Sequence, residues 1–228
     1  MNVTYIKHSG FLIETNDCYY LFDYYKGTLP SLNTGKPIFV FSSHGHSDHY
    51  NPDIFSLLKK NGMVQVNAIL SEDIPEEKYP AKLLDVNCTK VTFHQTYCLP
   101  FETMVYTLRS TDEGVAFLLK CPEGTIYHAG DLNDWVWDGE PESDNREMTS
   151  RYQKEICYLR DISLDFAMIP LDPRQEKYYA EGILFFLKNV SVKKVYPMHY
   201  WEQPQIIDQF LKEHHEYTDI IIYPENNN

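Results

Sequence analysis

Residues 39–50 read FVFSSHGHSDHY, and the fold prediction starts from this stretch. An apolar run typical of a buried strand is followed, within six positions, by four residues whose side chains bind metals: His44, His46, Asp48 and His49. In an extended segment His44 and His46 project to the same side, so both imidazoles can reach one metal ion. Asp48 and His49 lie past the bend, where they can face a second ion. The spacing therefore predicts a metal centre.

Strand and helix patterns alternate around this stretch. Short β-branched and aromatic runs predict strands over residues 3–6, 11–15, 19–23, 38–42, 63–70, 90–93, 104–109, 115–120, 125–128, 165–170, 194–197 and 219–223. Helical signals predict helices from residue 51 onward and over 148–159, 181–188 and 205–214. This order indicates an α/β (α+β) fold in which two mixed sheets pack face to face with helices outside. We expect a single domain over residues 1–228, with a helical insertion at about 138–162.

Composition excludes several classes of partner. The 228 residues include 20 Lys and Arg against 33 Asp and Glu, a formal charge of −13, so neither nucleic acid nor an anionic membrane surface is an expected partner. The N-terminus lacks a basic and apolar leader, and no apolar run approaches the roughly 20 residues that span a bilayer. The five cysteines never form a C-x-x-C pair. We therefore expect a soluble, cytoplasmic protein with reduced thiols.

The chain resembles the metallo-β-lactamase superfamily, whose H-x-H-x-D-H motif is matched by residues 44–49. The resemblance implies an αββα sandwich with one or two metals at the edge of the sheets. Residues 127–131 (YHAGD) are similar to the strand after which an aspartate, here Asp131, bridges two metals. Residues 195–200 (VYPMHY) are similar to the late strand that ends in the second-site histidine, here His199. Residues 5–14 (YIKHSGFLIE) resemble the ascorbate-6-phosphate lactonase-like branch, in which a histidine, here His8, lies close to the metals.

One feature of that superfamily is missing. A histidine usually completes the first site, but residues 109–117 (RSTDEGVAF) contain none. Asp112 stands in a turn between two predicted strands, where it is either a replacement ligand or a solvated turn residue. His94 precedes the strand that leads to this turn, so it is the weaker candidate. The predicted metal ligands are His44, His46, Asp48, His49, Asp112, Asp131 and His199.

These residues predict a metal-dependent hydrolase with two divalent ions, zinc first and manganese or iron as alternatives. A metal-activated hydroxide would attack a carbonyl or phosphoryl centre, and the expected catalytic residues are Asp48, Asp131 and His8. Asp131 would orient the hydroxide, and His8 either donates to the substrate or has a structural role.

The expected substrate is a small metabolite, either phosphorylated or a lactone or ester. The alternatives are a metal-dependent phosphodiesterase or nuclease, and a non-catalytic protein that binds a metal or metabolite with a degenerate first site. The aromatic residues expected to wall a substrate pocket are Tyr50, Trp135, Trp137, Tyr200 and Trp201, and the cations expected to meet an anionic group are Arg109, Arg174 and Lys177.

Overall fold

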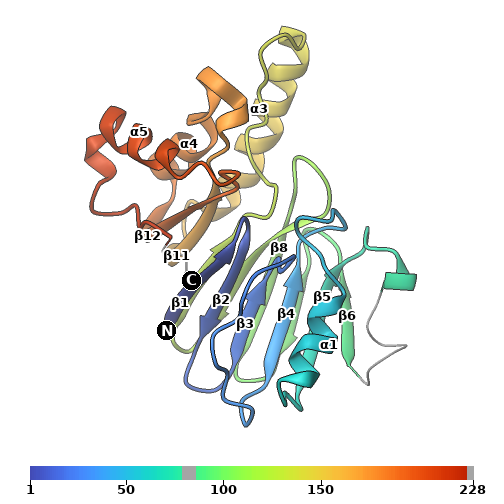
Figure 1. Ribbon diagram of the computed structural model, residues 1–228. Helices are drawn as coiled ribbons and strands as arrows, with labels where there is room; N and C mark the ends of the chain where they lie inside the picture. Colours follow the sequence, from blue (N-terminus) through green and yellow to red (C-terminus); the bar gives the residue numbers. More distant parts are fainter. Residues whose placement is uncertain (79–85, 225–228) are drawn as a thin grey trace.

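The computed structural model describes residues 1–78 and 86–224 and shows two six-stranded sheets that pack against each other (Figure 1). Sheet A contains, in spatial order, β1 (Asn2–Lys7), β2 (Gly10–Glu14), β3 (Tyr19–Phe22), β4 (Ile38–Ser42), β5 (Val66–Ser71) and β6 (Asn87–Val91). Sheet B contains β12 (Ser191–Met198), β11 (Ser163–Pro170), β10 (Gly124–His128), β9 (Val115–Cys121), β8 (Thr103–Arg109) and β7 (Thr96–Leu99). Both sheets are mixed, as predicted, because each joins antiparallel strands to a parallel set.

Helices cover the outer faces of both sheets. The α-helices are α1 (Asp53–Lys60), α3 (Glu142–Ile156), α4 (Glu181–Asn189) and α5 (Gln205–Glu213). Short 3₁₀ turns η1 (Glu76–Lys78), η2 (Cys157–Leu159), η3 (Pro173–Tyr178) and η4 (His215–Tyr217) join some of these elements. Helix α1 packs on sheet A, and α3, α4 and α5 gather near β11 and β12 (Figure 1). Among the described residues, no helix combines the length and apolar character needed to cross a membrane.

The central strands of sheet A are buried on both faces. Along β4, Phe39 and Phe41 belong to the core between the sheets, whereas Ile38 and Val40 pack toward α1. This alternation follows from the two-residue period of a strand, and it explains why the sequence reads as a continuous apolar run. The apolar face of α1, which includes Ile54, covers the outer side.

The strand directions bring several chain segments to one edge of the molecule. Strands β3 and β4 are parallel, and so are β10, β11 and β12, so their carboxyl ends meet at a common edge within each sheet. Strand β1 runs in the same direction as β3, because each is antiparallel to β2. The turn between β8 and β9 lies at the same edge, since β9 is antiparallel to β10. Polar residues that follow these strands therefore come close together.

Several elements differ from the sequence prediction, among them β6, which was predicted over 90–93 and spans Asn87–Val91. Helix α3 begins at Glu142 instead of Met148, because the acidic residues of its first turn favour the positive end of the helix dipole. The strand predicted over 219–223 is reduced to a single bridge between Val195 and Ile221, since the chain enters it from the turn η4 and reaches β12 only there. Strand β7 was not predicted, because it is an edge strand of only four residues, none of which is fully buried.

Candidate metal centre

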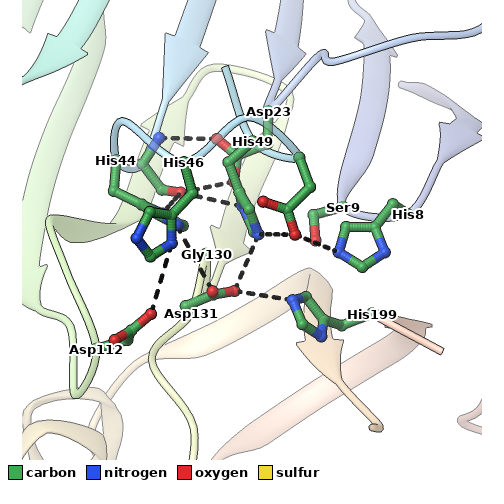
Figure 2. Close-up of polar contacts among 12 residues, drawn as sticks. His8, Ser9, Asp23, His44, His46, His49, Asp112, Gly130, Asp131 and His199 are labelled. Carbon is green, nitrogen blue, oxygen red and sulfur yellow. Dashed lines mark hydrogen bonds and ion pairs between the residues drawn. The ribbon is translucent and has the colours of Figure 1, made fainter. Parts of the chain in front are cut away.

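The candidate ligands lie at the strand ends described above (Figure 2). His8 follows β1, the motif of residues 44–49 follows β4, Asp131 follows β10, and His199 follows β12. Asp112 lies in the turn between β8 and β9. Local sequence places each side chain just beyond a rigid strand, and the common edge brings them together.

The ligand atoms form two groups, and within each group they all lie within 4.8 Å of one another. The group that we call the inner group consists of His8, Asp48, His49 and His199. The group that we call the outer group consists of His44, His46, Asp112 and Asp131. All seven predicted metal ligands belong to one of these groups. His8, which the sequence placed only near the metals, joins the inner group.

Asp131 lies between the two groups. Its Oδ1 is 3.2 Å from His49 Nε2 and 3.4 Å from His199 Nε2, and its Oδ2 is 3.6 Å from His44 Nε2. One carboxylate therefore faces inner-group imidazoles with one oxygen and an outer-group imidazole with the other. The indole of Trp135 holds this segment by donating from Nε1 to the backbone oxygen of Asp131, at 2.9 Å.

Four imidazole nitrogens and one carboxylate oxygen of the two groups are buried and have no hydrogen-bond partner. Within residues 1–78 and 86–224 these atoms are Nε2 of His8, His44, His49 and His199, together with Oδ1 of Asp131. Burying a polar atom without a partner costs about 1–3 kcal/mol, and natural proteins rarely accept several such atoms side by side. Imidazole nitrogens and a carboxylate are the donors that zinc prefers, and a bound cation would satisfy all of these atoms.

A buried carboxylate that was not predicted, Asp23 at the end of β3, orients one imidazole in each group. Asp23 accepts the Ser43 backbone N–H at 2.7 Å and the Ser43 hydroxyl at 2.7 Å, and its Oδ2 lies 2.8 Å from His49 Nδ1. His44 Nδ1 is 3.0 Å from Ser43 Oγ. Since the hydroxyl proton goes to Asp23, Ser43 Oγ accepts from His44. In its neutral form each imidazole therefore carries its proton on Nδ1, which leaves Nε2 to bind a metal.

A second carboxylate that was not predicted, Asp172, orients the imidazole of His199. Its Oδ2 lies 2.8 Å from His199 Nδ1 and 3.2 Å from Trp201 Nε1. The Arg174 guanidinium donates from Nε at 3.0 Å to both oxygens of Asp172 and from Nη2 to one of them. Carboxylate partners of this kind set the tautomer and the ring orientation of a metal-binding histidine.

Strained backbone and close packing hold these segments in place. His8, Asp23 and His199 adopt left-handed conformations, with φ of 57°, 41° and 64°. Such values are uncommon outside glycine and occur frequently at functional sites. At Gly130, where φ is 53°, a Cβ atom would lie 2.6 Å from Ser43 Cβ, so only glycine lets the Asp131 segment approach the motif this closely.

The charges around the two donor groups favour a bound cation. Burial lowers the pKa of an imidazole, but for His49 the carboxylates of Asp131, Asp23 and Asp48 outweigh burial and raise its pKa to about 9. Burial and the neighbouring His49 lower the pKa of His44 to about 4, so this imidazole is neutral at pH 7. Partial burial and the Asp131 carboxylate raise the pKa of Asp112. A divalent cation would relieve the repulsion between these carboxylates.

Two cavities border the donor groups. One of about 650 Å³ is lined by His8, Tyr25 and Trp201, and by Lys7 and Lys26. Another of about 230 Å³ is lined by Thr111, Asp112, Asp131, Trp135, Trp137, Met148, Arg174 and His199. All three tryptophans of the chain therefore lie beside the centre, as the sequence predicted for Trp135, Trp137 and Trp201.

Several sequence candidates lie elsewhere. His94 pairs with Glu155, at 2.9 Å from Nε2 to Oε2, and belongs to neither donor group. Arg109 packs over the ring of Phe93, and Lys177 pairs with Asp138 at 2.7 Å. Of the three predicted cations, Arg174 lines a cavity with Asp112, Asp131 and His199, and Arg109 lines a separate cavity that includes Asp112 alone of the donor groups.

Comparison with known proteins agrees with this geometry. A family model described as a beta-lactamase superfamily domain matches residues 2–142, more than half of the chain. The chain belongs to the metallo-β-lactamase superfamily. The recognition from the H-x-H-x-D-H motif is thus confirmed, whereas the likeness to the lactonase branch stays a prediction.

Relatives of this superfamily are similar over much of the chain. A protein of Caldivirga maquilingensis named UPF0173 metal-dependent hydrolase is 28% identical over 174 residues, which are 74% of this chain and 66% of that protein. A Bacillus cereus relative with the same name is 28% identical over 221 residues, 90% of this chain and 88% of that protein. The matched part thus spans just under two thirds of the first relative and most of the second.

Solved structures show the same fold. The metallo hydrolase Igni18 of Ignicoccus hospitalis aligns with a TM-score of 0.66 at 18% identity, over 98% of this chain and 95% of that chain. CmlA, a diiron β-hydroxylase from Streptomyces venezuelae, aligns with a TM-score of 0.66 at 12% identity, over 98% of this chain and 52% of that chain. The predicted sandwich of two mixed sheets is therefore confirmed.

Proposed function

We propose that this protein is a metal-dependent hydrolase that acts on a small metabolite. The observation that carries the proposal is the presence of four buried, unpartnered imidazole Nε2 atoms and one unpartnered carboxylate oxygen within the two donor groups. The names of the relatives, metal-dependent hydrolases, support the same class. We further propose two divalent ions. Zinc suits the imidazoles, and the carboxylates of Asp48, Asp112 and Asp131 also allow manganese or iron.

The donor groups fit the chemistry of hydrolysis. Divalent ions lower the pKa of a bound water to near 7 and polarise a carbonyl or phosphoryl oxygen. Asp131 keeps its two oxygens toward the two groups, which suits it to orient the attacking water. His8 Nε2 lies 3.4 Å from Asp48 Oδ2 inside the inner group, so we assign His8 to metal binding instead of proton donation to a leaving group.

The cavities support a small and anionic substrate. Their volumes, about 650 and 230 Å³, suit a metabolite, and the tryptophans supply flat apolar walls. Lys26 and Lys7, the latter paired with Glu202, line the larger cavity, and Arg174, which also donates to Asp172, lines the smaller one. Basic groups of this kind recognise phosphate or carboxylate, so we prefer a phosphorylated metabolite over an uncharged lactone or ester.

The test is hydrolysis by metal-loaded protein of a panel that contains phosphomonoesters, lactones, carboxylic esters and an aryl phosphodiester. The inactive variant combines Asp48→Asn with His49→Asn. Its matched control combines Asp219→Asn with His215→Asn, which makes the same chemical changes at exposed positions outside both groups. We expect turnover that chelation abolishes, that the control keeps, and that the first variant loses, because it removes two ligands and one carboxylate charge.

Each arm of the panel has a defined meaning. Turnover of a phosphomonoester supports the preferred substrate class, and turnover of the phosphodiester alone would favour the alternative phosphodiesterase. Full activity in the Asp48 and His49 double variant, or the absence of metal-dependent turnover across the panel, would refute a metal-dependent hydrolase of small metabolites.

A further inference from the structure

We propose that the two donor groups fill in a fixed order: a divalent cation binds first and tightly to the inner group, and a second cation binds weakly and exchangeably to the outer group. This inference rests on the metal dependence proposed above. It adds which of the two donor groups binds its ion tightly. It follows from three differences between the groups, in burial, in the partners of the imidazoles and in competing contacts.

The groups differ first in burial. The inner imidazoles of His8, His49 and His199 are all buried. In the outer group, by contrast, the side chains of His46 and Asp112 are 48% and 45% exposed. An exposed side chain loses rotamer freedom when it binds an ion, at a cost of up to about 1–2 kcal/mol, whereas a buried one is already ordered. The inner group is therefore better organised before any ion binds.

The second difference is in the partners that orient the imidazoles. In the inner group, Asp23 orients His49 and Asp172 orients His199, both at 2.8 Å. In the outer group, His44 contacts no carboxylate through Nδ1 and reaches Asp23 only through the neutral Ser43 hydroxyl. A supporting partner of this kind typically changes metal affinity by about 10–100-fold. The inner group has two carboxylate partners of this kind.

The third difference is a competing contact. His46 Nε2 lies 3.6 Å from Glu113 Oε2, and His46 Nδ1 lies 3.8 Å from Asp112 Oδ2. Glu113 belongs to neither donor group, so its carboxylate competes with an incoming ion for the exposed imidazole. A second cation is also repelled by the first, because both groups face Asp131. Both effects weaken only the later binding step.

The order of filling has a consequence for the protein in a cell. At limiting metal, most molecules would contain one ion in the inner group, and the outer group would follow the free metal concentration. The complete two-metal centre would then form only when metal is abundant.

The experiment is a titration of the full, metal-free chain with Co²⁺, followed by calorimetry and by visible absorption, neither of which needs a substrate. The outer variant is Asp112→Asn. Its matched control is Glu113→Gln, which removes one carboxylate charge from the same turn, also near His46, but outside both donor groups. The inner variant is Asp172→Asn, which disturbs His199 without removing a ligand. Circular dichroism checks that each variant is folded.

For the wild type we expect two binding steps whose dissociation constants differ by about 10–100-fold or more. Asp112→Asn should lose the weak step and keep the tight one within about twofold, and Asp172→Asn should weaken the tight step by about 10–100-fold. Glu113→Gln should weaken neither step. Two equal steps in the wild type, or loss of the tight step in Asp112→Asn, would overturn the proposed order.

The outcomes separate this inference from the proposed function. If two ions bind in the opposite order, only the order is wrong. If they bind in the expected order and no substrate class is hydrolysed, the order stands and the hydrolase proposal fails. If neither Co²⁺ nor Zn²⁺ binds the folded wild type, both proposals fail.

Discussion

Asp23 is the residue whose replacement tests the arrangement of the centre most directly. The wild-type carboxylate accepts three hydrogen bonds, from the Ser43 backbone N–H, the Ser43 hydroxyl and His49 Nδ1. In Asp23→Asn one oxygen becomes an NH₂ group that can only donate. If this group faces His49 and the Ser43 hydroxyl, His49 Nδ1 must accept, and its proton moves to Nε2. The Ser43 hydroxyl then donates to His44 Nδ1, so the proton of the His44 imidazole must also lie on Nε2.

The isosteric change thus blocks one imidazole in each donor group. Supporting partners are worth about 10–100-fold in metal affinity, so we expect each of the two binding steps to weaken by that factor, or about 1.4–2.8 kcal/mol. Asp23→Ala removes the acceptor without inserting a donor. It should therefore be no more damaging than Asp23→Asn, although alanine is the larger change in volume.

Co²⁺ titration of the full chain measures both steps. Asp165→Asn is the matched control, because this carboxylate on β11 pairs with Lys193 at 2.7 Å and lies outside both groups. We expect wild-type binding in the control. Binding constants within about twofold of wild type in Asp23→Asn, or a much milder defect than in Asp23→Ala, would refute the tautomer argument.

Three further substitutions have defined outcomes. Burial raises the pKa of Asp134 from 3.8 to about 6, so ionisation of this carboxyl group opposes folding as pH rises through this range. Urea titrations of the metal-free protein should show that Asp134→Asn raises the free energy of unfolding, relative to wild type, by about 2 kcal/mol more at about pH 7.5 than at about pH 4.5. An equal effect at both pH values would contradict this. Phe117→Ala removes a fully buried ring between the sheets and should cost about 3–5 kcal/mol in urea unfolding, whereas a loss below about 1 kcal/mol would show that the core tolerates the cavity. Gly114→Ala places a Cβ atom 1.9 Å from the Ser43 backbone oxygen at a φ of 70°, so the turn that carries Asp112 must move and the weak Co²⁺ step should be lost; an unchanged titration would argue against a role for this turn.

Local patterns were enough to predict the motif of residues 44–49 and its position after a buried strand. A strand end and a short bend place these side chains close together in the chain, and the structure divides them as His44 and His46 in one group and Asp48 and His49 in the other. Asp112 was predicted by elimination, and the structure places it in the outer group with His46. Its position depends on the turn between β8 and β9, which the sequence also indicated.

The two orienting carboxylates could not be predicted in the same way. Asp23 lies 26 residues from His49, and Asp172 lies 27 residues from His199. Each is simply an acidic residue after a buried strand, and such residues are common in turns. The one available signal was their position at the carboxyl ends of strands that turn out to be parallel to those carrying the ligands.

The sequence by itself determined the superfamily, the alternation of strands and helices, and most of the candidate metal ligands, because these properties depend on residue type and short-range spacing. Tertiary structure alone decided how the ligands divide into an inner and an outer group, that His8 belongs to the inner one, and that buried carboxylates orient its imidazoles. Those properties depend on burial and on contacts between distant strand ends, which exist only once the two sheets have packed.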